Sequence, residues 1–156
     1  MRVGIGYDSH RYSTDRPLIL GGVTIPEGPG LAGHSDADAV AHALTDALLG
    51  AAALGDIGSH FPDTDSRWRD ADSLALLAHA YALVRDAGLR LANADVTVLL
   101  ERPRLRPYVD AMRARISEAL SVDAALISVK AKTNEGMGFV GRGEGIAVIA
   151  VALLAQ

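Results

Sequence analysis

Stretches typical of strands alternate with stretches typical of helices along this chain, and that order limits the folds open to it. Four stretches carry the apolar runs or alternation expected of strands: 3–7, 91–100, 126–131 and 146–154. The last is apolar on both faces, so we expect helices to bury one side and another subunit to bury the other. Strands interleaved with helices predict a mixed-sheet α/β (α+β) fold with the helices packed on one face.

Apolar residues recur at helical spacing in three other stretches, each with residues suited to begin or end a helix. These are 38–54 with Ser35 or Asp36 before it and Gly55 after it, 72–87 with Gly88 after it, and a helix that opens at Pro107. Gly21-Gly22 separates two short apolar runs, 18–20 and 23–25, which predicts a two-residue hairpin. We therefore expect a mixed four-stranded sheet plus a small hairpin.

Length and composition limit the number of domains and the classes of function open to the chain. A chain of 156 residues suits one domain, 1–156. A net charge of −4 without any basic run argues against a nucleic acid or an anionic membrane as partner, so an anionic substrate would need bound cations. The absence of cysteine removes disulfides and thiolate nucleophiles, and leaves His and carboxylates as metal ligands. No signal peptide or membrane-length apolar run is visible, so a cytoplasmic protein is expected.

The core must be built largely from Ala, Leu and Val, because the chain has one Trp, four Tyr and two Phe in a hydrophobic content of 49%. Small side chains bury little area each. A domain of this kind often gains stability by burying a further face against copies of itself, so we expect a homo-oligomer.

Asp8, His10 and His42 could close around one divalent metal. Asp8 and His10 are two residues apart in strand-like sequence, so both side chains leave the same face. With His42 on the predicted helix 38–54, they would form an O, N, N site with one coordination position open, as in catalytic zinc sites. The alternative is a set of solvated polar side chains, because an Asp-x-His pair alone is common.

Two polar groups flank that helix. His34 and Ser35 precede it, where backbone N–H groups and the positive helix end favour an anion. Alternatively, Ser35 is only a cap and His34 a surface residue. Asp56 follows the helix in a loop of glycines and carboxylates, 55–65, and could bond a substrate hydroxyl. The alternative there is a turn with solvated acids.

Thr133 and Glu135 end a strand and run into five glycines within ten residues, from Gly136 to Gly145. Backbone without side chains can approach a ligand, Thr133 offers a hydroxyl, and Glu135 could hold a hard cation such as Mg²⁺. A glycine-rich reversal between strands is the equally weighted alternative.

Several motifs occur in order over nearly the whole chain. They are Asp8-Ser9-His10, the stretch 34–58 with His34-Ser35-Asp36 and Gly55-Asp56-Ile57-Gly58, Phe61-Pro62-Asp63-Thr64-Asp65, and Gly141-Arg142-Gly143-Glu144-Gly145. In these motifs the chain resembles the 2-C-methyl-D-erythritol 2,4-cyclodiphosphate synthase family. The resemblance implies a homotrimer with its sheets facing inward and active sites between adjacent subunits.

The resemblance also implies roles for single residues. Asp8, His10 and His42 would bind Zn²⁺ or another divalent transition metal, and Glu135 would hold Mg²⁺ or Mn²⁺ that bridges substrate phosphates. His34 and Thr133 are implied as catalytic residues. Arg142 and Glu144 resemble residues lining an axial cavity that can take an isoprenoid diphosphate. The implied substrate-binding residues are Asp8, His10, His34, Ser35, Asp56, Gly58, Asp63, Lys132, Thr133, Asn134, Glu135, Phe139 and Arg142.

Two departures from the family pattern concern the nucleotide. Lys132 would add a positive charge beside the nucleotide phosphates. Residues 100–106 are rich in arginine where the family has its cytidine pocket, which leaves the individual contacts there open.

The implied reaction belongs to non-mevalonate isoprenoid biosynthesis. It converts 4-diphosphocytidyl-2-C-methyl-D-erythritol 2-phosphate to 2-C-methyl-D-erythritol 2,4-cyclodiphosphate and CMP by intramolecular phosphate attack. Two alternatives remain open: a zinc-dependent phosphoester hydrolase with Asp56 or Glu135 as base, and a non-catalytic isoprenoid-diphosphate binding module around Arg142 and Glu144.

Overall fold

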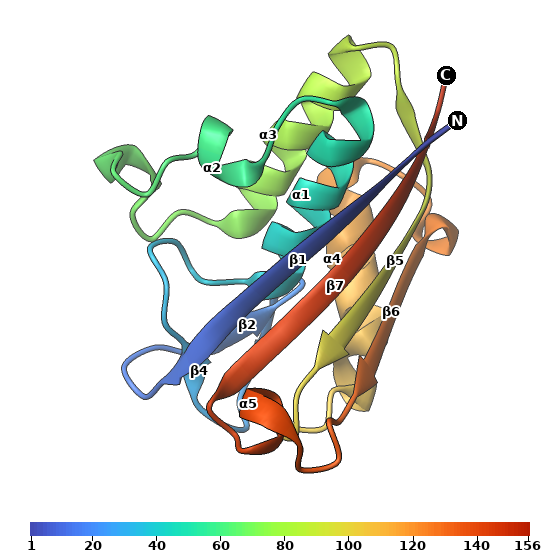
Figure 1. Cartoon of the computed structure of the whole chain (residues 1–156). Coiled ribbons are helices and arrows are strands. Elements are labelled where there is room, and N and C mark those ends of the chain that lie inside the picture. The colour runs from blue at the N-terminus through green and yellow to red at the C-terminus, as the bar shows by residue number, and fades with distance from the viewer.

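A mixed sheet of five strands forms the front of the molecule in the computed structural model, which describes residues 1–156 (Figure 1). The strand order is β4-β1-β7-β5-β6, with β5 and β6 parallel and the other neighbours antiparallel. The strands are β1 (Arg2–Ser13), β4 (Gly30–Leu31), β5 (Arg90–Leu99), β6 (Ile127–Lys132) and β7 (Gly145–Ala155). The four predicted strands are present, and β4 adds a two-residue fifth strand that was not predicted.

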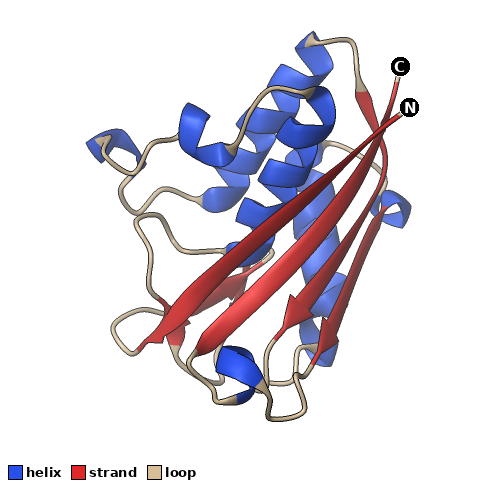
Figure 2. Cartoon of the chain, in the orientation of Figure 1, coloured by secondary structure: helices blue, strands red, loops and turns tan.

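Three long helices cover one face of this sheet, as predicted (Figure 2). They are α1 (Ala39–Ala52), α3 (Ser73–Asp86) and α4 (Val109–Leu120). The predicted hairpin is formed by β2 (Leu18–Leu20) and β3 (Val23–Ile25). The remaining elements are the short helices α2 (Ile57–His60) and α5 (Gly138–Gly141) and the 3₁₀ turns η1 (Ser66–Trp68), η2 (Arg106–Tyr108) and η3 (Ala124–Leu126). No helix combines the length and hydropathy that a membrane span requires. The described residues thus form a single α+β domain.

The predicted caps of α1 were wrong at both ends. Its N-cap is Asp38, whose buried carboxylate accepts from the N–H groups of Val40 and Ala41. The same carboxylate accepts from Gly21 and Gly22, at 2.9 and 2.7 Å, and so ties the hairpin to the helix. The helix ends at Ala53, which is left-handed, before Gly55 is reached. The carboxylate of Asp38 thus serves two segments, and only the fold reveals this.

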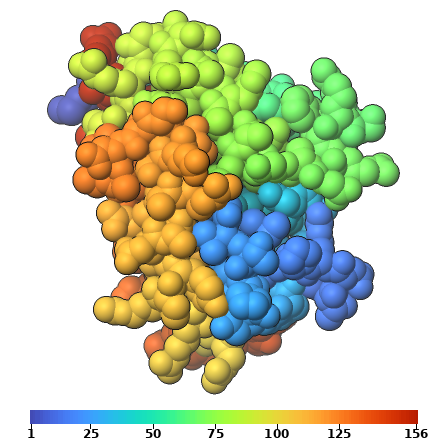
Figure 3. All heavy atoms as spheres, turned by 180° about the vertical axis from the view of Figure 1, so that it is seen from behind, coloured from blue at the N-terminus to red at the C-terminus, as the bar shows by residue number.

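Contact between backbones sets the distance from α1 to β1. A Cβ placed on Gly4 would lie 2.1 Å from the carbonyl oxygen of Ala47, and one on Gly6 would lie 1.8 Å from that of Ala43. No larger residue fits at either position. Eleven of the fourteen residues of α1 are buried, and Figure 3 shows α3, α4 and the hairpin (blue) covering it from behind. This close approach brings the helix within reach of the side chains on the inner face of β1.

The outer face of the sheet carries an apolar patch. Val3, Ile5 and Tyr7 are 69%, 70% and 55% exposed on β1, and Ile149 and Val151 lie opposite Tyr7 and Ile5 on β7. Exposed apolar residues gathered on adjacent strands mark a surface suited to a protein contact. The second burial predicted for the strand 146–154 would cover this patch, and it stays a prediction.

Candidate metal centre and pocket

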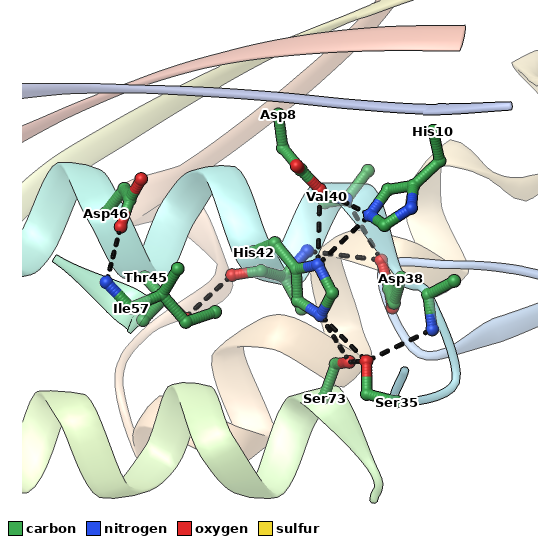
Figure 4. A network of polar contacts seen from close by, with 12 residues as sticks. Asp8, His10, Ser35, Asp38, Val40, His42, Thr45, Asp46, Ile57 and Ser73 are labelled. Atoms are coloured by element: carbon green, nitrogen blue, oxygen red, sulfur yellow. Dashed lines mark hydrogen bonds and ion pairs between the residues drawn. The ribbon is translucent and has the colours of Figure 1, made fainter. Parts of the chain in front are cut away.

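Three predicted ligands meet at one point between β1 and α1 (Figure 4). Asp8 Oδ2 lies 2.8 Å from His10 Nε2 and 3.1 Å from His42 Nδ1, and the two ring nitrogens are 3.3 Å apart. All three residues are half-buried. The spacing is close to the roughly 3.4 Å expected between ligand atoms around a tetrahedral ion with bonds of about 2.1 Å.

The local sequence explains this convergence. Side chains alternate across a strand, so Asp8 and His10 share the inner face of β1 with Gly4 and Gly6. The glycines let α1 approach, and His42 projects from the helix toward the two strand residues. The predicted strand 3–7 was too short, because β1 continues to Ser13 and holds both ligands rigidly.

Hydrogen bonds orient both imidazoles with a lone pair toward this point. His10 Nδ1 lies 2.6 Å from the carbonyl oxygen of Ala32, which only accepts, so Nδ1 carries the proton. His42 Nε2 lies 2.9 Å from Ser73 Oγ, whose own proton goes to Asp36, so Nε2–H donates to Ser73. The nitrogens that face Asp8 are therefore free of protons in the neutral rings. Such outer hydrogen bonds are typical of metal-binding histidines.

The ionisation of Asp8 favours a bound cation. Burial raises the pKa of Asp8, but the hydrogen bonds that the rings of His10 and His42 donate to it when protonated outweigh burial, so the net pKa lies below its ordinary value. Burial lowers the pKa of His10, but its hydrogen bond with Asp8 makes the net shift upward, so a bound metal would replace a proton at this nitrogen. A carboxylate and two imidazole lone pairs aimed at one point fit a divalent metal better than any arrangement of the bare side chains.

A hollow of about 510 Å³ adjoins this cluster. Among the predicted site residues, His34, Ser35, Gly58 and Asp63 line it together with His10 and His42, and its floor is apolar. Asp56 does not line the hollow: its exposed carboxylate caps α2, accepting from the N–H and hydroxyl of Ser59 at 2.8 and 2.6 Å. The predicted loop 55–65 therefore contains a short helix.

The predicted anion site at the start of α1 needs a correction. The N–H groups of Val40 and Ala41 donate to Asp38, and the N–H of Asp38 donates to Asp36. These donors are consequently not free to bind a ligand. His34 and Ser35 can still reach one, because they line the hollow beside the metal ligands.

A second hollow, of about 190 Å³, lies at the ends of β5 and β6. Lys132 and Thr133 line it with the arginine-rich stretch 100–106, as the departures in the sequence suggested. Asn134 N donates to Glu101 at 2.7 Å, and Thr133 Oγ1 donates to Glu135 at 3.1 Å. No residue lines both hollows, so within the single chain the second hollow does not join the one beside His10 and His42.

The remaining predicted residues lie near the start of β7. Arg142 Nε donates to Glu144 at 2.6 Å. Phe139 and Glu144 line a third hollow, of about 340 Å³, that also reaches His10. Phe139 is therefore near the metal ligands, whereas Arg142 is engaged in an exposed ion pair.

Sequence reasoning missed Ser73 and Asp36 as supports of His42. Ser73 lies 31 residues from His42 along the chain. Neither residue belongs to a periodic pattern that distinguishes it from an ordinary polar residue at a helix end, so no signal in a single sequence could have assigned this role.

The model of the YgbB family matches residues 1–155. The chain belongs to the YgbB family. A 2-C-methyl-D-erythritol 2,4-cyclodiphosphate synthase of Moorella thermoacetica is 62% identical over 99% of this chain and 94% of its own length. The synthase of Salinibacter ruber is 60% identical over 99% of this chain and 98% of its own length.

Solved structures of cyclodiphosphate synthases have the same fold as this chain. A 2C-methyl-D-erythritol-2,4-cyclodiphosphate synthase in a CDP-bound form superposes with a TM-score of 0.90 at 43% identity, over 99% of this chain and 100% of that chain. The bifunctional IspDF of Campylobacter jejuni superposes with a TM-score of 0.95 at 46% identity, over 98% of this chain but 42% of that longer chain. The relatives and structural neighbours are cyclodiphosphate synthases, in agreement with the resemblance found in the sequence.

Proposed function

We propose that this YgbB chain, as one domain of residues 1–156, is a 2-C-methyl-D-erythritol 2,4-cyclodiphosphate synthase. It would release CMP from 4-diphosphocytidyl-2-C-methyl-D-erythritol 2-phosphate and thus act as a phosphorus–oxygen lyase. The convergence of Asp8, His10 and His42 beside the 510 Å³ hollow carries this proposal. The full-length identity to named synthases supports it.

The reaction places few demands on proton transfer. An oxygen of the substrate's 2-phosphate forms a bond to the β-phosphorus, and the bond from that phosphorus to the CMP oxygen breaks. Nucleophile and leaving group are both anionic phosphates, so no strong base is needed. Catalysis reduces to bending the substrate, aligning the two oxygens and offsetting negative charge.

Asp8, His10 and His42 would hold Zn²⁺, and Glu135 would hold Mg²⁺ or Mn²⁺; when bound, these ions offset the charge of the diphosphate. His34 and Ser35 would contact phosphate from the wall of the first hollow. Gly58, Asp63 and the nearby Asp56 would bind the methylerythritol portion.

The nucleotide would occupy the second hollow. There Thr133, Asn134 and Lys132 would bind the cytidine diphosphate, with the ammonium of Lys132 beside the phosphates. His34 and Thr133 are the residues that we assign to catalysis; His34 lines the first hollow and Thr133 the second.

Separation of the two hollows supports a homotrimer with active sites between subunits. One substrate has to reach both pockets, which a neighbouring subunit can supply if the sheets face inward across the apolar patch of Val3, Ile5, Tyr7, Ile149 and Val151. Arg142 and Glu144 would then line an axial cavity suited to an isoprenoid diphosphate. A cytoplasmic location stays a prediction.

Phosphorus NMR of the purified protein with substrate, Zn²⁺ and Mg²⁺ tests this function. We expect signals of a cyclic diphosphate and CMP, whereas ring-opened phosphates alone would indicate a hydrolase and unchanged substrate a binding module. Asp8→Asn removes one metal ligand with little change of shape and should lower turnover about 100-fold or more. Asp123→Asn changes an exposed cap of η3 and should leave turnover unaltered.

A further inference from the structure

Three segments of the chain meet at the guanidinium of Arg16, in the turn between β1 and β2. Arg16 Nη1 donates to the carbonyl oxygen of Gly33 at 2.6 Å, and Nη2 donates to that of Ser35 at 2.5 Å. Nη2 also lies 3.4 Å from Asp70 Oδ1. The N–H of Asp70 donates to the carbonyl oxygen of His34 at 3.0 Å. Three successive carbonyls, from Gly33 to Ser35, are thus held by Arg16 and its partner Asp70.

These bonds join two segments that line the 510 Å³ hollow, here called its two walls. The first contains His34 and Ser35, and the second, which precedes Asp70, contains Asp63, Thr64 and Trp68. Each wall is a stretch without a long helix or a strand, so its backbone position depends on a few such contacts. Asp70 itself is left-handed, with φ of 55°, a conformation that persists where surrounding contacts enforce it.

Arginine is suited to this position and lysine is not. A guanidinium is planar and presents several N–H groups in a fixed fork, so it can reach two carbonyls at once, whereas an ammonium is a single point of charge. The side chain is 23% exposed and borders an open hollow of about 580 Å³. Water can therefore replace it at the carbonyls, and its loss should disturb the position of the loop more than the stability of the fold.

We propose that Arg16 is a positioning residue that locks the backbone of 33–35 to the segment 65–72, so that both walls of the hollow keep one spacing around a phosphorylated substrate. The kinetic part of this proposal rests on the proposed function. The structural part does not, because the spacing of the walls can be observed without turnover.

Trp68 is the only tryptophan of the chain and lies two residues from Asp70, so its fluorescence reports on the second wall. Arg16→Ala should raise the quenching of Trp68 by acrylamide about twofold, because a released segment exposes the indole more often. Guanidinium at about 50 mM, far below the molar concentrations that unfold small proteins, should reverse much of the change. Arg115→Ala, an exposed arginine on α4, is the matched control and should behave as wild type with or without guanidinium.

Two further variants keep the proposal testable if Arg16→Ala does not fold. Arg16→Lys keeps the charge but lacks the fork, and Asp70→Ala removes the carboxylate that Arg16 reaches but keeps the backbone N–H bond to the carbonyl of His34. Arg16→Lys should raise quenching as Arg16→Ala does, and Asp70→Ala should raise it less. In turnover assays, Arg16→Ala should lower kcat/KM about 10- to 100-fold, as expected for small misplacement of binding groups, and guanidinium should restore part of it.

Quenching of Arg16→Ala, Arg16→Lys and Asp70→Ala equal to that of Arg115→Ala would overturn the proposal. So would a loss of activity that guanidinium leaves unchanged while Trp68 stays protected. If the wild type makes no cyclic product, the proposed function fails, and the fluorescence results still decide the role of Arg16.

Discussion

Gly6→Ala should separate the metal ligands although it changes none of them. The added Cβ would lie 1.8 Å from the carbonyl oxygen of Ala43, 2.8 Å from its carbonyl carbon and 2.9 Å from Ala47 N. All three atoms are backbone, so no rotamer change relieves the overlap. To restore ordinary contact, α1 has to move away from β1 by about 1.5 Å.

This displacement acts on His42, which precedes Ala43 in the helix. The distances from His42 Nδ1 to Asp8 Oδ2 and His10 Nε2, now 3.1 and 3.3 Å, would widen to about 4.7 Å, beyond the roughly 3.4 Å that a tetrahedral zinc ion spans. We therefore expect zinc affinity to fall by at least about 100-fold. Overpacking should also lower the free energy of unfolding of the metal-free protein by about 1–3 kcal/mol.

Competition for zinc with a chromophoric chelator measures the affinity, and urea unfolding of the metal-free protein measures the stability. Gly50→Ala is the matched control, because it makes the same change within α1 where nothing lies within 4 Å of the new Cβ. It should retain zinc affinity and gain a little helix stability. Adding Ala43→Gly to Gly6→Ala should not restore binding, because the clash is with a carbonyl. Wild-type zinc affinity in Gly6→Ala would refute the reasoning.

Three further predictions concern the supports of the site. Ser73→Ala removes the acceptor of His42 Nε2–H and should weaken zinc binding about 10- to 100-fold in the chelator assay; an unchanged affinity would show that Ser35 alone orients the ring. Asp38→Ala leaves four N–H groups without their acceptor and should lower the free energy of unfolding by about 4 kcal/mol in urea titrations, whereas Asp123→Ala, an exposed cap, should cost less than about 1 kcal/mol. Burial raises the pKa of Asp38 to about 6 from 3.8, against donation by backbone N–H groups, so the part of the stability that comes from the proton on this carboxyl is full below about pH 4 and is lost as the pH rises through 6, whereas the hydrogen bonds that the carboxyl accepts remain. The difference in unfolding free energy between wild type and Asp38→Asn should therefore shrink from pH 4 to pH 7, and a constant difference would contradict this.

The sequence allowed the convergence of Asp8, His10 and His42 to be predicted because the placement of these residues follows from short-range geometry. Asp8 and His10 share a strand face by their spacing, and the helical period placed His42 on the neighbouring helix. The hairpin at Gly21-Gly22 was predicted to the residue, because a two-residue turn has a local signature.

The rest depends on contacts between distant segments. Asp38 became the cap of α1 because the hairpin brings Gly21 and Gly22 to it, and β4 exists only because β1 lies beside it. Arg16 bonds to Gly33, which is 17 positions away along the chain, and Ser73 bonds to His42, which is 31 positions away. Hydrogen bonds of this kind leave no period in a sequence, so they have to be read from the fold.

The pairing of the first and last strands determines where a second protein domain would be attached to this one. Arg2 lies opposite Leu154, so both ends of the chain leave from one corner (Figure 1). Asp8 is six residues further along β1, about 20 Å away at the usual strand rise. A fusion partner could be tethered through either end at the same place without crowding the 510 Å³ hollow. The bifunctional chain of Campylobacter jejuni, which carries a domain of this shape within a longer protein, is compatible with such an attachment.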